Sequence, residues 1–238
     1  MSRSRRPDAP PPAPRRRAVL AAIGAVLAAP VARAATRQAT PAQTSGPFYP
    51  RTPPVEVDAD LTSVAGRAPA RGAHTELTGR VLDTGGRPLS GAMVEIWQCD
   101  AHGRYHHPGD DRPVPLDPGF QGYGHTRCDA AGGYRFRTIR PVAYPGRAPH
   151  IHVAVRESGS VRLVTQLYVA GAPENASDRL LDAIDAARRE ALLVRFEAGD
   201  AGILRAHFEM VVDRGQAAVE PPWVAWMRRH LEDARRTA

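Results

Sequence analysis

Two histidines separated by a single residue, His150 and His152, are the first candidates for chemistry in this sequence. On a β-strand, residues i and i+2 point to the same face, so the two imidazoles would lie on one side, about 7 Å apart at the backbone. Two neutral imidazoles on one face can bind one metal ion. Surface or core histidines produce the same pattern, so the pair alone leaves both interpretations open.

A tyrosine and an arginine lie just before this pair. Tyr144 and Arg147 belong to a segment that contains proline and glycine, where irregular backbone can turn side chains toward a site. A second source of ligands is the long connection over residues 100–125, because a loop of this length in a compact domain is uncommon unless it has a function. Its imidazoles and phenols are those of His102, Tyr105, His106, His107, Tyr123 and His125.

The residue types favour one kind of metal. The chain has no cysteine cluster for structural zinc and no His-Glu-x-x-His motif. A tyrosine ligand must lose its proton, and free phenol has a pKa of about 10, so the ion must be strongly Lewis-acidic. Ferric iron is the obvious candidate because phenolate is a hard anionic ligand. Two phenolates, two imidazoles and one hydroxide would give a neutral centre, which suits a buried site.

The segments that position these residues have the sequence pattern of short β-strands. Apolar and polar residues alternate most clearly over residues 133–139, where Tyr134, Phe136 and Thr138 share one face. Repeated short strands split by Gly, Asp and Pro predict an all-β fold, a β-sandwich with long active-site loops and one or two peripheral helices. The strands are expected over residues 75–82, 92–99, 133–139, 149–156, 162–169, 194–198 and 203–212.

Two helices are expected outside the strands. Residues 178–191 carry an apolar stripe and can be capped by Ser177. Residues 223–236 follow two prolines and predict a C-terminal helix.

The sandwich domain, with this helix at its end, is therefore expected over residues 75–238. Residues 35–74 are rich in Pro, Ala, Thr, Arg and Gly without lasting periodicity and are expected to form an extended N-terminal arm.

The positive charge lies at the start of the chain. The sequence has 238 residues and a formal net charge of +7, and residues 1–34 hold seven arginines and one acidic residue. The rest has 25 arginines and 24 acidic residues, so no nucleic-acid partner is implied for the folded part. Arg16, Arg17, a short apolar run and a small-x-small cleavage site resemble a twin-arginine export signal. We expect a periplasmic protein without a stable membrane span.

The two cysteines, Cys99 and Cys128, leave two interpretations open. An oxidising compartment would permit a disulfide between them. Both also fall in or beside strand-like segments, where a free cysteine is an ordinary small core residue. The sequence does not supply the distance that decides between a bridge and two free thiols.

Eight short motifs in order between residues 40 and 170 resemble the intradiol ring-cleavage dioxygenases, of the protocatechuate 3,4-dioxygenase and catechol 1,2-dioxygenase type. Each motif is weak alone, but their joint order and spacing are specific. They are QTSGP at 43–47, VEIWQ at 94–98, GRY at 103–105, DPGFQGYG at 117–124, YRFRTI at 134–139, YP at 144–145, PHIH at 149–152 and QLY at 166–168.

The resemblance implies a β-sandwich enzyme that inserts both atoms of O2 into a catechol-type ring to give a cis,cis-muconate-type diacid. Its partners would be a small aromatic diol and O2, and the sequence leaves open whether the chain forms a homo-oligomer. The implied cofactor is non-haem Fe(III), and its implied ligands are Tyr105, Tyr144, His150 and His152.

The resemblance also implies roles beyond metal binding. Tyr144 would be the ligand that leaves when the substrate arrives. Arg147 would bind the substrate and stabilise negative charge on its ring, with Gln166 assisting. The substrate pocket would be lined by Trp97, Gly46 and Pro47. His106 and His107 are expected to be exposed or to lie behind the ligands, because adjacent residues on a strand point to opposite sides.

One departure from the family pattern bears on the substrate. Only five residues separate Tyr144 from His150, and Gly146 stands where the family often has tryptophan. We expect a more open or differently shaped pocket on that side, which argues against protocatechuate as the substrate without identifying another diol. Two alternatives are a non-catalytic exported β-sandwich that binds a metal or other ligand, and an Fe(II) extradiol oxygenase with two histidines and a carboxylate. No Asp or Glu stands at convincing spacing beside His150 for the latter.

Overall fold

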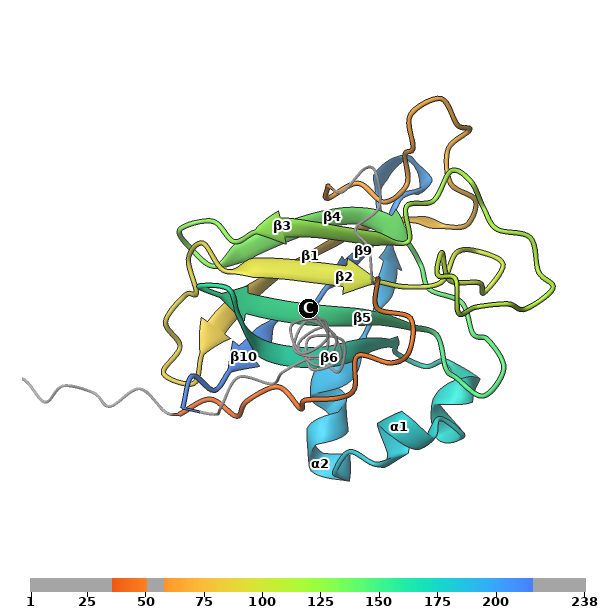
Figure 1. Ribbon diagram of the computed structural model, residues 1–238. Helices are drawn as coiled ribbons and strands as arrows, with labels where there is room; N and C mark the ends of the chain where they lie inside the picture. The colour runs from red at the N-terminus through yellow and green to blue at the C-terminus, as the bar shows by residue number, and fades with distance from the viewer. Residues whose placement is uncertain (1–35, 51–57, 216–238) are drawn as a thin grey trace, which may run out of the picture. The chain divides into compact units, whose positions relative to one another are not determined.

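The computed structural model describes residues 36–50 and 58–215, which fold as two five-stranded β-sheets packed as a sandwich (Figure 1). The predicted all-β class and sandwich are confirmed. The predicted export signal over 1–34 and terminal helix over 223–236 lie outside the described residues. The strands are β1 (His74–Asp83), β2 (Met93–Trp97), β3 (Tyr123–Arg127), β4 (Gly133–Ile139), β5 (His150–Glu157), β6 (Ser160–Val169), β7 (Leu193–Val194), β8 (Phe196–Ala198), β9 (Leu204–His207) and β10 (Met210–Val212).

The first sheet is built around β1 and the second around β5. Strand β1 pairs antiparallel with β4 along one edge and parallel with β9 and then β10 along the other, and β8 pairs with β9. The second sheet has the order β3-β2-β5-β6-β7. Within it, β3, β2, β5 and β6 pair antiparallel with one another, and β7 pairs parallel with β6.

Two predicted strands are each split in the structure. The single strand expected over 194–198 is wrong because Val194 pairs with β6 in the second sheet, whereas Phe196 pairs with β9 in the first. The strand expected over 203–212 is interrupted at Phe208. Its backbone N–H donates to the Thr78 carbonyl, so β9 and β10 pair with separate parts of β1.

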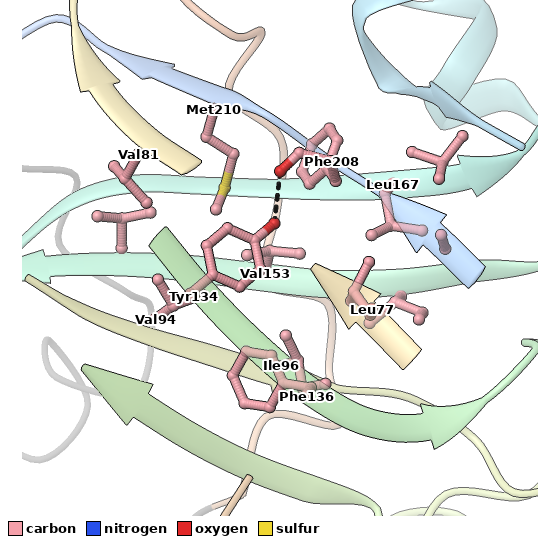
Figure 2. Close-up of a cluster of buried hydrophobic side chains, with 14 of the residues drawn as sticks. Leu77, Val81, Val94, Ile96, Tyr134, Phe136, Val153, Leu167, Phe208 and Met210 are labelled. Atoms are coloured by element: carbon pink, nitrogen blue, oxygen red, sulfur yellow. Dashed lines mark hydrogen bonds between the residues drawn. The ribbon is translucent and has the colours of Figure 1, made fainter. Parts of the chain in front are cut away.

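The main core lies between the two sheets and follows the alternation of their strands (Figure 2). Leu77 and Val81 of β1 face Ile96 of β2 and Val153 of β5 across this core. The hydroxyl of Tyr134 is also buried here and donates to the Phe208 carbonyl at 2.6 Å, so its polar end is satisfied. The expectation that Tyr134, Phe136 and Thr138 share one face of β4 is confirmed, and all three are buried.

The predicted helix over 178–191 is wrong. Two four-residue α-helices, α1 (Arg179–Asp182) and α2 (Ala186–Arg189), occupy this stretch with the 3-10 turns η1 (Pro173–Ala176) and η2 (Glu190–Leu192), and a third turn, η3 (Asp200–Gly202), follows β8. Asp178, rather than Ser177, caps α1 by accepting from the N–H groups of Leu180 and Leu181. Asp185 caps α2, so a second helix begins where the first would have continued.

The arm over residues 36–50 begins beside the first sheet, where the Thr40 N–H donates to the Val211 carbonyl, and then passes β6 to cover the outer face of the second sheet. The Gln43 N–H donates to the Val164 carbonyl, and the Thr165 hydroxyl donates to the Pro41 carbonyl. A smaller apolar cluster lies under this arm and includes Trp97, Tyr105 and Tyr123, with Phe48 and Tyr49 of the arm packed against it. The arm is therefore extended, as expected, but it is fastened to the sheet.

The long connection expected over residues 100–125 spans residues 98–122, because β2 ends at Trp97 and β3, a strand that the sequence did not predict, begins at Tyr123. Cys99 and Cys128 are both buried as free thiols, Cys99 in the outer cluster and Cys128 in the main core.

Within residues 36–50 and 58–215, no helix has both the length and the apolar character needed to cross a bilayer.

Candidate metal centre and substrate site

Strand β5 places the two histidines side by side. Ile151 and Val153 point into the main core, so the alternation of the strand directs His150 and His152 to the outer face, where both are at least 98% buried. His152 pairs across the sheet with Trp97 of β2 and Gln166 of β6. The expectation that the two imidazoles share one face is confirmed.

The two imidazoles direct nitrogen atoms at each other. His150 Nδ1 lies 2.6 Å from the Ala148 carbonyl, and this bond requires the proton on Nδ1, which leaves the lone pair on Nε2. That Nε2 lies 3.3 Å from the Nε2 of His152. Burial, followed by the positive charge of Arg147, lowers the pKa of His150 to about 4. Burial likewise holds the pKa of His152 well below its usual value, so both rings are neutral at pH 7.

Two tyrosines come to the same place from separate loops. The hydroxyl of Tyr105 lies 3.3 Å from His150 Nε2. The ring of Tyr144 meets that of Tyr105 edge to face at 5.7 Å and lies 5.5 Å from the His150 ring. Burial raises the pKa of both phenols, and for Tyr144 the charge of Arg147 opposes the rise. Each phenol would therefore ionise at neutral pH only beside a strongly attracting cation.

These four donors fit a hard trivalent metal ion. Two nitrogen ligands that each lie roughly 2.1 Å from an ion are at most about 4.2 Å apart, and the 3.3 Å between the two Nε2 atoms is within that limit. In a neutral pair, the N–H of His152 Nε2 can donate to the lone pair of His150 Nε2, and a bound metal ion would take the place of that proton. In the described part of the chain, no group of three His, Cys, Asp or Glu could hold a metal ion, so the phenols of Tyr105 and Tyr144 are needed to complete this donor set.

Arg147 lies beside the four donors with its guanidinium held on several sides. Its Nη2 donates to Gln166 Oε1 at 2.5 Å, and its Nε donates to Asp178 Oδ2 at 3.0 Å. Its Nη1 lies 3.5 Å from the hydroxyl of Tyr144. Gln166 is fully buried and also donates from Nε2 to the Thr44 carbonyl. The structure thus brings Arg147 and Gln166 together with the candidate ligands.

The arm closes the site from the other side through Gly46. The indole of Trp97 donates to the Ser45 carbonyl at 3.3 Å and stacks on His152. Gly46 has a φ of +66°, and a Cβ added there would lie 3.1 Å from Cε1 of His152. A glycine is needed for both the conformation and the close approach. Pro47 follows on the exposed side of the turn.

The two histidines after Tyr105 lie outside the group of candidate ligands, as expected, although the strand alternation used to argue this does not apply here. His107 is buried and its ring contacts that of Phe48, because residues 106–109 form a turn in which strand alternation does not apply. His106 lies near the buried Asp100, with 3.6 Å between His106 Nε2 and Asp100 Oδ2. Neither belongs to the group formed by the four donors.

Sequence reasoning missed several side chains that support the site. Phe48 stacks on Tyr105 at 4.7 Å, and the guanidinium of Arg112 lies 5.0 Å above the ring of Tyr144. The hydroxyl of Tyr168 lies 3.4 Å from Arg147 Nη2. Asp178 could have been noticed from the sequence as a helix-capping residue but not as a partner of Arg147.

Comparisons with known proteins agree on the type of protein this chain resembles. A family model described as dioxygenase matches residues 44–214, most of the chain. The protocatechuate 3,4-dioxygenase beta chain of Burkholderia cepacia is 43% identical over 149 residues, which is 59% of this chain and 63% of the relative. The catechol 1,2-dioxygenase of Candida albicans is 31% identical over 173 residues, which is 65% of this chain and 54% of the relative. The match therefore spans little more than half the length of these relatives.

A solved structure supports the same assignment. The dioxygenase domain of a dioxygenase carbohydrate-binding protein fusion from the cellulolytic bacterium Streptomyces sp. SirexAA-E superposes with a TM-score of 0.58 and 31% sequence identity. The match covers 74% of this chain and 99% of that domain. The fold is thus shared with a solved dioxygenase domain.

Proposed function

Because the chain belongs to the intradiol ring-cleavage dioxygenase family, we propose that it opens a catechol-type ring between the two carbons that carry the hydroxyl groups. Both atoms of O2 would enter the product, a cis,cis-muconate-type diacid. The cofactor proposed is non-haem Fe(III), held by Tyr105, Tyr144, His150 and His152.

One observation carries the proposal. The hydroxyl of Tyr105 and the Nε2 of His152 each lie 3.3 Å from the Nε2 of His150, and Tyr144 borders the same point. A metal centre with two phenols and two neutral imidazoles offers hard, partly anionic ligands. When bound there, ferric iron would act as a Lewis acid on the two oxygens of the catechol.

The side chains of the site would also accept a proton from the substrate and stabilise negative charge on its ring. A catechol that binds through both oxygens must lose two protons, and the Tyr144 phenolate is a base placed to accept one of them. Arg147, 3.5 Å from that hydroxyl, holds a permanent positive charge where negative charge would develop on the substrate ring. The hydrogen bond to Gln166 fixes the orientation of the Arg147 guanidinium, because Gln166 is itself bonded to the Thr44 carbonyl of the arm.

Trp97 and Gly46 would form part of the substrate pocket wall, together with Pro47. A Cβ added at Gly146 would meet no atom within 4 Å, which supports a pocket that is open beside Tyr144. The substrate class we propose is a small aromatic diol, such as the catechol named in the description of one relative. Openness on this side favours a diol other than protocatechuate.

The Fe(II) extradiol alternative needs a carboxylate ligand beside the histidines. No group of three His, Cys, Asp or Glu suited to a metal occurs in residues 36–50 and 58–215, and the buried Asp178 faces Arg147 instead. This disfavours the extradiol interpretation. The binding-module alternative does not account for the alignment of Arg147 and Gln166 beside the donors.

Oxygen consumption tests the proposed function directly. Iron-loaded protein is mixed with catechol, hydroxyquinol or protocatechuate, and dissolved O2 is followed. We expect uptake with at least one diol, and loss of uptake in His152→Ala, which removes one candidate ligand. Iron-loaded protein that consumes no O2 with any of the diols would favour a binding module.

Export and location form a separate proposal, supported by the arginine pair and apolar run within residues 1–34. We propose a periplasmic protein whose leader is removed after residue 34. N-terminal sequencing of protein from the periplasmic fraction of the producing bacterium tests this, and an intact leader on all of the active protein would contradict it.

A further inference from the structure

A single buried carboxylate connects three parts of the site. Asp178 Oδ2 accepts from Arg147 Nε at 3.0 Å and from the Ala148 N–H at 2.8 Å. Its other oxygen, Oδ1, accepts from the N–H groups of Leu180 and Leu181 at the start of α1. The side chain of Asp178 is fully buried, so each of these bonds is shielded from water.

We infer that Asp178 is a positioning residue of the proposed reaction, fixing both the catalytic guanidinium of Arg147 and the orientation of the ligand His150. The inference rests on the proposed function and extends it to a residue 31 positions beyond Arg147 in the chain. Neither effect requires Asp178 to touch the substrate or the metal.

The first route runs through Arg147. A guanidinium has five N–H donors in one rigid plane, so fixing one edge sets the direction of the others. Asp178 holds Nε, which leaves Nη1 directed at the Tyr144 hydroxyl and Nη2 at Gln166. Without the carboxylate, the arginine head could rotate away from the place where substrate charge develops. The expected result is slower chemistry with little change in KM.

The second route runs through Ala148. Asp178 holds the N–H of this residue, and the carbonyl of the same residue lies 2.6 Å from His150 Nδ1. That contact keeps the His150 proton on Nδ1 and its lone pair on the Nε2 that faces His152 and Tyr105. Loss of the hydrogen bond to the Ala148 N–H would therefore weaken the contact that orients the candidate ligand His150. Partners of this type typically change metal affinity or activity about 10–100-fold when removed.

The two oxygens of Asp178 allow its capping role to be separated from its positioning role. Serine is a good helix-capping residue but lacks a second oxygen and a charge. Asp178→Ser can keep a bond to α1 while losing those to Arg147 and Ala148. The matched control is Asp185→Ser, because Asp185 caps the adjacent α2 through the N–H of Ala187 and its side chain is exposed.

The experiment compares iron-loaded wild type, Asp178→Ser and Asp185→Ser by kcat, KM, iron per chain and the visible absorption of ferric tyrosinate. We expect Asp185→Ser to match wild type in all four. Asp178→Ser should lose about 10–100-fold in kcat with a smaller change in KM, and its absorption band should shift or weaken. If Asp178→Ser does not fold, the same comparison is made with the near-isosteric Asp178→Asn.

Two outcomes separate this inference from the proposed function. If wild type is active and an Asp178 variant matches Asp185→Ser in kcat and in the absorption band, the positioning role is overturned. An Asp178 variant that loses only thermal stability also overturns it, because a purely structural residue would do this. If iron-loaded wild type cleaves no catechol, the proposed function fails, while the band and iron content still report whether Asp178 orients the ligands.

Discussion

The indole of Trp97 lies flat against the imidazole of His152, with ring centroids 5.0 Å apart and planes 4° from parallel. Trp97 is held in turn by the arm, through its bond to the Ser45 carbonyl and the edge-on ring of Tyr49 at 4.9 Å. Behind Tyr49, the buried Glu95 accepts from the Tyr49 hydroxyl and from Arg156. The orientation of a candidate ligand thus depends on a segment more than 100 residues away in the sequence.

Replacing Trp97 should weaken the metal centre although Trp97 is not one of the four candidate ligands. Trp97→Leu removes the stacking partner of His152 and the bond to Ser45, so we expect about tenfold faster loss of iron to a chelator. Trp97→Phe keeps an aromatic ring and should lose less. Equal iron retention in wild type and both variants would show that the stack does not hold His152.

Gly46→Ala should damage the site through one methyl group. The positive φ of Gly46 costs an alanine about 1–2 kcal/mol of folding stability, and the new Cβ would lie 3.1 Å from His152. Gly66 provides the control, because its φ of +71° imposes the same strain while its Cβ would meet nothing within 4 Å. Chemical denaturation should show similar losses in both variants, with activity reduced only in Gly46→Ala. Similar activity losses in both would contradict a specific contact.

The two candidate tyrosine ligands should each contribute to visible colour in the iron-loaded protein. Tyr105→Phe and Tyr144→Phe remove one phenolate each, and each should shift or weaken the ferric tyrosinate band. Tyr134→Phe is the control, because Tyr134 is buried like Tyr105 but bonds to Phe208 in the main core. It should lose about 1 kcal/mol of stability and keep the band. A band that survives both ligand variants would exclude tyrosine ligation.

Stability of the iron-free protein should fall as the pH is lowered from about 6.5 toward 4. The pKa of His150 is lowered to about 4 in the folded state, mainly by burial, whereas an unfolded histidine has a pKa near 6.5. Between these values the unfolded chain binds the extra proton, so the stabilisation is complete above pH 6.5 and is lost as the pH falls through 4. The loss for His150 is on the order of 3 kcal/mol. The free energy of unfolding, measured in urea across this range, should depend less steeply on pH in His150→Gln than in wild type.

Much of the fold follows from local pattern. The alternation over residues 133–139 predicted β4 with its correct bounds, and the H-x-H spacing placed His150 and His152 on one face. Both predictions rest on the two-residue period of a strand, which does not depend on the partners. The ligand set and Arg147 came from the order of motifs, and their roles stay predictions until the variants above are measured.

The features that sequence reasoning missed depend on contacts between distant segments. Asp178 has an evident capping role, but only the fold shows that its second oxygen reaches Arg147. The division of residues 178–191 at Asp185 and the crossing of the chain between sheets at residue 195 are likewise set by pairing partners. Helix and strand periodicity contains no information about such partners.

The identity of the ring-opened product tests the central claim most directly. Iron-loaded protein is given its preferred catechol under ¹⁸O2, and the product is identified by mass spectrometry and NMR. The proposed function predicts a muconate-type diacid with one labelled atom in each of its two new carboxyl groups. A semialdehyde from cleavage outside the two hydroxyl-bearing carbons, or a product without both labels, would contradict intradiol cleavage by this chain.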